Sequence, residues 1–161
     1  MQEFLDKITS YNLFNNLLPG VIFSVLINQI AQIDLIGDDI FVSFFVCYFT
    51  GLVIGRFGSL IVEPILKKIG FLKFATYEAF VTASMLDNKI EILSETNNIY
   101  RSISSTLILI LLIEAFIKLS SLWPLLLHYR IAILISLLLI IFLFSYRKQT
   151  QYIKSRINIY K

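Results

Sequence analysis

Four long apolar segments stand in two pairs along the chain, at residues 17–36 and 40–62 and then at 102–122 and 131–146. A helix of roughly 20 residues crosses the hydrocarbon core of a bilayer, which is about 30 Å thick. Hydrophobic residues make up 57% of the 161 residues, and the mean hydropathy is +0.79. Soluble domains rarely reach these values. The pattern predicts an all-α polytopic membrane protein with four transmembrane helices.

The parts of the chain outside these segments are too short to bury a core of their own. We therefore expect one membrane domain over residues 1–161. The parts outside the spans are expected to be an interfacial helix at 1–16, a helical cytoplasmic segment at 64–101 and a basic tail with a further interfacial helix at 147–161.

The positive charges favour one orientation. Every Lys and Arg except Lys118 and Arg130 falls on the same side of a four-span layout, in the N-terminal, middle or C-terminal segment. The positive-inside rule then places both termini and the middle segment on the cytoplasmic side of the membrane. The net charge of +3 is explained by this bias and by attraction to anionic headgroups, without direct contact to nucleic acid.

Three side-chain amides interrupt the first span. Asn28, Gln29 and Gln32 share one stripe at helical spacing. Amides in hydrocarbon need partners, so the stripe is expected to face other helices or water rather than lipid. Two interpretations stay open, namely hydrogen bonds between helices and a polar lining.

The second span carries a stripe of glycines at Gly51, Gly55 and Gly58. Gly51 and Gly55 form a GxxxG pair, which allows the backbone of a neighbouring helix to approach closely. The stripe predicts close helix packing, either within one chain or between copies.

Near the expected cytoplasmic end of the same span, Arg56 and Glu63 lie seven residues apart, on one face of an α-helix. One interpretation is a charge pair at a gate or a partner surface. The other is an arginine that extends to the interface beside a solvated glutamate.

Glu114 is the most unusual residue of the third span. It lies about 12 residues into the segment, which is roughly 18 Å along a helix axis. An intramembrane carboxylate is costly unless it is paired or protonated, and Lys118 lies one turn further on. We expect either an internal ion pair near the outer interface, or an ion path or charged ring in an oligomer.

The middle segment offers the best candidate surface for a protein partner. Thr76 is expected to cap one helix, and helical spacing without a breaker predicts a second helix that runs from about residue 88 to 122. This second helix would project three to four turns into the cytoplasm. The acidic residues Glu78, Glu91 and Glu95 mark the candidate partner surface.

No catalytic, phosphate-binding or metal-binding motif is present in the sequence. We therefore expect neither enzyme activity nor a cofactor. Four short spans also offer too little volume for an enclosed substrate site, so a pore would need several copies.

Three stretches, YNLFNNLLPG at 11–20, GRFGSLIVEP at 55–64 and NNIYR at 97–101, follow one another in a recognisable order. The chain resembles the small four-span proteins of bacterial anti-phage defence loci, a set that includes the membrane subunit of Kiwa and the membrane accessory of type VI-B CRISPR loci. The likeness covers most of the chain in layout. It implies an inner-membrane protein that assembles with copies of itself beside a cytoplasmic partner that senses nucleic acid. No functional residue is carried over from it.

Together these features predict an oligomeric membrane component of a defence system, which alters membrane permeability or senses membrane stress together with a cytoplasmic partner. Two alternatives remain, a non-conducting scaffold that anchors a soluble enzyme and a small transporter subunit.

Overall fold

The structure, a computed structural model, describes residues 10–159 and is helical throughout its regular elements. In chain order these are α2 (Ser10–Ala31), α3 (Ile40–Phe57), the π-helix η1 (Gly58–Val62), α4 (Glu63–Lys68), α5 (Tyr77–Leu86), α6 (Lys89–Leu122), α7 (Pro124–His128) and α8 (Arg130–Ile159). Four helices are long and apolar enough to span a membrane, at Leu13–Ala31, Ile40–Lys68, Lys89–Leu122 and Arg130–Ile159. The predicted fold class is therefore confirmed, including a short helix between the second and third spans.

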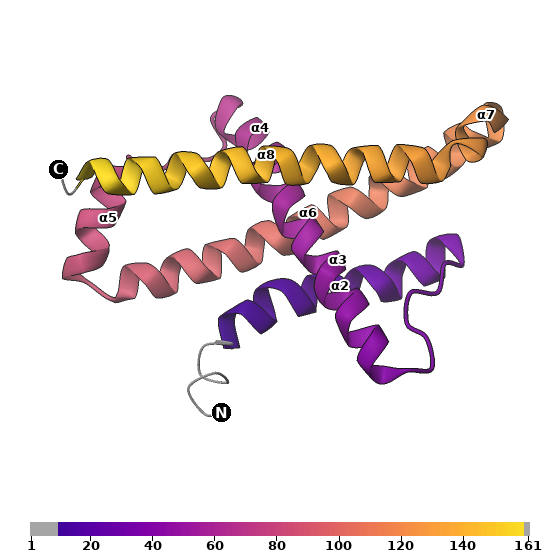
Figure 1. The fold of residues 1–161 in the computed structure, drawn as a ribbon, viewed down its shortest axis with the longest axis horizontal. Coiled ribbons are helices and arrows are strands. Elements are labelled where there is room, and N and C mark those ends of the chain that lie inside the picture. The colour runs from indigo at the N-terminus through magenta and orange to yellow at the C-terminus, as the bar shows by residue number, and fades with distance from the viewer. Residues whose placement is uncertain (1–9, 160–161) are drawn as a thin grey trace.

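Three of the long helices, α2, α6 and α8, run along the long axis of the molecule, between its two ends (Figure 1). In the view of Figure 1, α2 and α6 run from left to right, α8 returns from right to left, and α3 crosses the others at a steep angle. The helix α5 lies at the left, near the C-terminal end of α8, whereas α7 lies at the right. We call these the α5 end and the α7 end. The expected interfacial helix at 1–16 falls partly outside the described residues, and α2 already begins at Ser10.

The first span ends earlier than the apolar pattern predicts. Gln32 adopts a left-handed conformation with φ of 54°, and its N–H donates to the carbonyl of Asn28 at 2.9 Å. This geometry closes α2 at Ala31, five residues before the expected end at residue 36. Pro19 lies well inside α2, where its missing N–H leaves the carbonyl of Asn15 without the usual helical donor.

The second span continues further than expected. Asp39 caps α3 by accepting hydrogen bonds from the N–H groups of Phe41 and Val42. The helical path then passes through η1 and α4 to Lys68, beyond the expected end at residue 62. It stops where Gly70 adopts a φ of 79°, a value that glycine tolerates without strain.

Two of the remaining helices extend beyond their spans. Thr76 caps α5 by accepting from the N–H of Ala79, as expected. The helix α6 is continuous over 34 residues, which confirms the predicted extension of the third span. The helix α8 also runs unbroken to Ile159, so residues 147–159 continue the fourth span instead of forming a separate interfacial helix.

Glycines at the helix crossings let the helices approach closely, and larger buried side chains such as Ile54 and Phe57 fill the core around them. At the crossing of α2 and α3, a Cβ atom added to Gly51 would overlap the carbonyl oxygen of Asn16, and one added to Gly20 would overlap that of Cys47. Gly58 packs in the same way against Ser105 of α6, whereas Gly55 lies 3.8 Å from the Ser102 hydroxyl and is less tightly enclosed. The glycine stripe thus packs within one chain.

The fourth span is attached to the core along a narrow line. It packs on α3 and η1, and Phe142 stacks on Phe49 with ring centroids 6.2 Å apart. At the α5 end, Tyr152 contacts the ring of Tyr77. Most of its apolar side chains are exposed, and Ser145 is its one buried residue within the described part of the chain. This exposure is what a lipid-facing helix requires.

Candidate functional site: a charged junction of the four spans

The carboxylate of Glu63 lies at the end of the second span and is almost fully enclosed. The residue is 7% exposed. Its two oxygens form separate ion pairs, with the Lys67 amine at 2.7 Å and with the Arg101 guanidinium at 3.0 Å. Lys67 follows one turn later in α4, whereas Arg101 comes from α6. The ion pair with Arg101 therefore links the second and third spans.

The partners of Glu63 differ from the expected one, Arg56. Residues 56 and 63 would share a face of a regular α-helix, but η1 lies between them. A π-helix bonds residue i to i+5 and turns the chain through a smaller angle per residue, so the two side chains point in different directions. Arg56 is exposed and forms no ion pair within residues 10–159. The interpretation as a charge pair is therefore wrong, and of the alternative only the exposed arginine agrees with the structure, because Glu63 is buried instead of solvated.

Lys148 of α8 contacts the π-helix at Ser59, whose carbonyl oxygen receives no hydrogen bond from a backbone N–H. The N–H of Glu63 donates to the carbonyl of Gly58, so it does not serve Ser59. The next donor in this register would be residue 64, but Pro64 has no N–H. The Lys148 amine donates to the Ser59 carbonyl and to the Ser59 hydroxyl, both at 2.7 Å. It thereby replaces the missing backbone donor.

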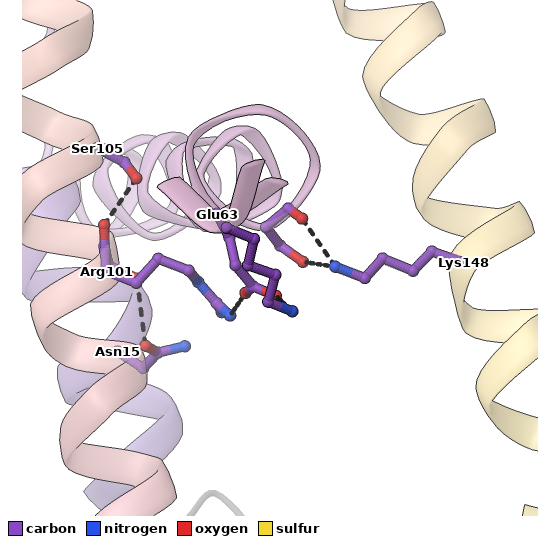
Figure 2. Close-up of polar contacts among 8 residues, drawn as sticks. Asn15, Glu63, Arg101, Ser105 and Lys148 are labelled. Carbon is purple, nitrogen blue, oxygen red and sulfur yellow. Dashed lines mark hydrogen bonds and ion pairs between the residues drawn. The ribbon is translucent and has the colours of Figure 1, made fainter. Parts of the chain in front are cut away.

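The first span joins the same group of residues through α6. The Ser102 hydroxyl donates to the side-chain oxygen of Asn15 at 3.3 Å, and the Ser105 hydroxyl donates to the Arg101 carbonyl at 2.7 Å. Figure 2 shows Arg101 and Lys148 reaching toward the region of Glu63 from helices on opposite sides of it. All four spans thus meet at one place. We call it the Glu63 junction, and it consists of Asn15, Ser59, Glu63, Lys67, Arg101, Ser102, Ser105 and Lys148.

The position of the Glu63 junction fits one surface of a bilayer. At 1.5 Å per residue, Arg101 lies about 32 Å along α6 from Leu122. Lys148 lies about 27 Å from Arg130 along α8. Each value is close to the thickness of the hydrocarbon core, about 30 Å. With the α7 end at one surface, the Glu63 junction lies at the other.

The amides of the first span lie away from the Glu63 junction. Asn28 and Gln29 occupy the last turn of α2 and are exposed. Gln32 lies beyond the helix, in the left-handed conformation that ends it. It is therefore not on the stripe that regular helical spacing predicts.

Glu114 and Lys118 form an ion pair on the surface of the third span. The Lys118 amine lies 2.8 Å from a Glu114 oxygen, one turn away along α6. The side chain of Lys118 is 77% exposed, and that of Glu114 is 42% exposed. The pair is about 20 Å from Arg101 along the helix axis, so it is separate from the Glu63 junction and lies toward the α7 end.

The expected partner surface lies on α5 and on the part of α6 that precedes Arg101. Glu78 and Glu91 are exposed, and Glu95 is half-buried. Three large apolar side chains of the same part of α6 are also exposed, namely Ile92, Leu93 and Tyr100. Leu93 and Tyr100 belong to the helical spacing that predicted this part of α6 as a partner surface.

Sequence reasoning missed most of the Glu63 junction. The one available signal was Pro64, because a proline inside a helical path leaves a carbonyl without its donor. Nothing in the sequence pairs that carbonyl, which belongs to Ser59, with a residue 89 positions later. Within residues 10–159, no three His, Cys, Asp or Glu side chains gather as a metal site would require.

No family model, curated protein or solved structure matches the chain. The geometry of its own residues therefore carries the inference about function.

Proposed function

We propose that this four-span protein is the oligomeric inner-membrane component of a bacterial anti-phage defence system, and that it changes membrane permeability together with a cytoplasmic partner. The observation that carries this proposal is the exposed Glu114–Lys118 ion pair on a membrane-spanning helix. The resemblance of the chain to small four-span defence proteins supplies the biological setting. In this arrangement the α5 end faces the cytoplasm, in keeping with the positive-inside rule.

The depth of the ion pair supports an oligomer. Glu114 lies about 12 Å along α6 from Leu122, where the helix ends. Charged side chains at such a depth cost several kcal/mol when they face lipid. A second copy of the chain, or water held between copies, would cover Glu114 and Lys118 and remove this cost. The exposed amides of Asn28 and Gln29 would gain in the same way.

The close packing of the helices within one copy also indicates that a pore would need several copies. Small residues close the α2–α3 and α3–α6 contacts, and the polar groups of the Glu63 junction bind one another. Two cavities are at the surface, one between α5 and α8 and one lined by apolar residues of α3. Neither crosses the bundle, so a permeation path would lie between copies.

Infected cells provide the test. Cells that carry the whole defence locus are infected with phage, and a voltage-sensitive dye reports the membrane potential while plating efficiency reports protection. Wild-type cells should depolarise, and Glu114→Ala should change both the depolarisation and the protection. Asp38→Ala is the matched control, because Asp38 is an exposed carboxylate in the turn after α2. Full protection at an unchanged membrane potential would contradict the permeability mechanism.

A non-conducting scaffold is the second candidate, and the exposed apolar side chains of α6 favour it. Apolar surface beyond the bilayer commonly marks a docking site. A scaffold would lose its partner when Leu93 or Glu91 is changed. Glu114→Ala would leave the binding of the partner unchanged. Co-purification of the partner with Leu93→Ser and with Glu114→Ala therefore separates the two candidates. A loss with Leu93→Ser alone, with normal protection by Glu114→Ala, would favour the scaffold.

A further inference from the structure

The Glu63 junction holds more positive than negative charge. Its single carboxylate forms ion pairs with Lys67 and Arg101. Lys148 is the third cation of the group, and Arg56 is a fourth nearby. Arg56, Lys67 and Arg101 all lie close enough to Lys148 for their charges to repel it. Several cations thus surround one anion at the edge of the hydrocarbon core.

These cations have unused capacity to donate hydrogen bonds. The Lys148 amine carries three protons, and the two contacts to Ser59 use two of them. The Nε proton of Arg101 is buried without an acceptor in the described part of the chain. Arg56 is exposed and forms no ion pair within residues 10–159. An acceptor with several oxygens and a negative charge would therefore complement the group.

The surroundings favour a phospholipid as the source of that acceptor. The Glu63 junction lies about 30 Å from the α7 end, at the edge of the hydrocarbon core and next to the headgroup region. The helix α8 packs on α3 and η1, and exposed apolar side chains cover much of α6 and α8 below this level. Acyl chains would have apolar surface to contact, directly beneath the cations.

We propose that the Glu63 junction binds the phosphate group of an anionic glycerophospholipid, with Arg56 and Lys148 as the donors that face it. The phosphate would balance the excess of positive charge, and the acyl chains would lie along α8. Basic groups between spans on the cytoplasmic side of a membrane are a known kind of site for anionic headgroups. This site does not depend on the proposed function, since either a pore or a scaffold would hold such a lipid.

The test uses the full chain purified in detergent and incubated with equal amounts of phosphatidylglycerol and phosphatidylcholine of identical acyl chains. Native mass spectrometry counts the retained lipids. We expect the wild type to retain phosphatidylglycerol selectively. Arg56→Gln should weaken that retention about fivefold, which corresponds to about 1 kcal/mol for one basic residue near the membrane surface. Arg56 is suited to this test because its exposed side chain leaves the ion pairs of Glu63 intact.

Two control variants and one competitor complete the experiment. Lys73→Gln removes an exposed positive charge of the loop before α5 and should bind as the wild type does. Arg56→Lys keeps the charge and should stay within about twofold of the wild type, because each Lys or Arg near an anionic surface contributes a similar attraction. An excess of inorganic phosphate should not displace the lipid. The proposal would be overturned by equal retention of the two lipids, by equal retention in Arg56→Gln and Lys73→Gln, or by displacement with inorganic phosphate.

Discussion

The amine of Lys148 donates to the carbonyl oxygen of Ser59 at 2.7 Å, across 89 residues of sequence. That carbonyl has no donor of its own, because the π-helix directs the N–H of Glu63 to Gly58 and because Pro64 has no N–H. A local irregularity of the second span therefore becomes the attachment point of the fourth. Few other contacts hold α8, so this one matters for the position of the whole helix.

Replacing Lys148 with methionine should destabilise the protein by about 1–3 kcal/mol, because the Ser59 carbonyl is left without a donor. The measurement is the free energy of unfolding in a denaturant titration of the purified protein in micelles. Lys154→Met is the matched control, since Lys154 is exposed in the same helix and should change the stability little.

Pro64→Ala supplies a direct check of the cause. Alanine restores an N–H at position 64, and this group can donate to Ser59 in the register of the π-helix. Lys148→Met should then cost about 1 kcal/mol less in the Pro64→Ala background than in the wild type. Strictly additive effects of the two substitutions would show that the contact does not replace the backbone donor.

Two glycines one turn apart should respond differently to the same substitution. Gly51→Ala places a methyl group against the backbone of Asn16, which cannot move without separating α2 from α3. We expect a loss of roughly 3 kcal/mol or failure to fold, judged by thermal unfolding and by yield. Gly55→Ala adds a methyl group 3.8 Å from the Ser102 hydroxyl, an ordinary contact, and should be tolerated. Equal effects would contradict the close crossing at Gly51.

Neutralising Glu63 should also be costly. Glu63→Gln leaves Lys67 and Arg101 without their anionic partner in a largely enclosed place, and breaking a buried ion pair on one side typically costs about 3 kcal/mol. Glu78→Gln changes an exposed carboxylate of α5 and should have little effect. The measurement is the free energy of unfolding of the two variants. A Glu63→Gln protein as stable as Glu78→Gln would contradict a stabilising role for the ion pairs of Glu63.

Much of the fold could be predicted from the sequence because lipid imposes simple rules. Apolar length specifies a span, and unbroken helical spacing from residue 88 predicted the long helix α6. Helix ends were harder to predict. The left-handed conformation of Gln32 ends α2 within an apolar stretch, and α8 passes Arg147 without a break because nothing in the polar tail stops a helix.

The candidate site was less predictable because it depends on how distant helices meet. Glu63 and Arg56 were paired on the assumption of regular α-helical spacing, and η1 invalidates that assumption. Arg101 and Lys148 come from other spans, and no local pattern specifies their distance to residue 63. In contrast, Glu114 and Lys118 lie one turn apart in a regular helix, so local spacing alone placed them together.

The proposed orientation predicts which loops a reagent reaches. In a Cys47→Ser background, Asp38→Cys should react with a membrane-impermeant thiol reagent in intact spheroplasts. Lys73→Cys should react only after the membrane is permeabilised, because it lies on the other side. Both positions are exposed in loops, so a difference in labelling reports topology. Labelling of both in intact spheroplasts would contradict the single membrane crossing, Ile40–Lys68, that separates the two positions.

The assembly of several copies through the Glu114 face of α6 is the central claim, and the mass of the particle extracted with its native lipids tests it most directly. We expect a multiple of the 18.6 kDa chain. Leu111→Trp, which adds bulk one turn from Glu114 on an exposed position, should lower the copy number. Leu134→Trp, on an exposed position of α8, should leave it unchanged. Particles that contain a single chain, in the wild type as in both variants, would contradict the account.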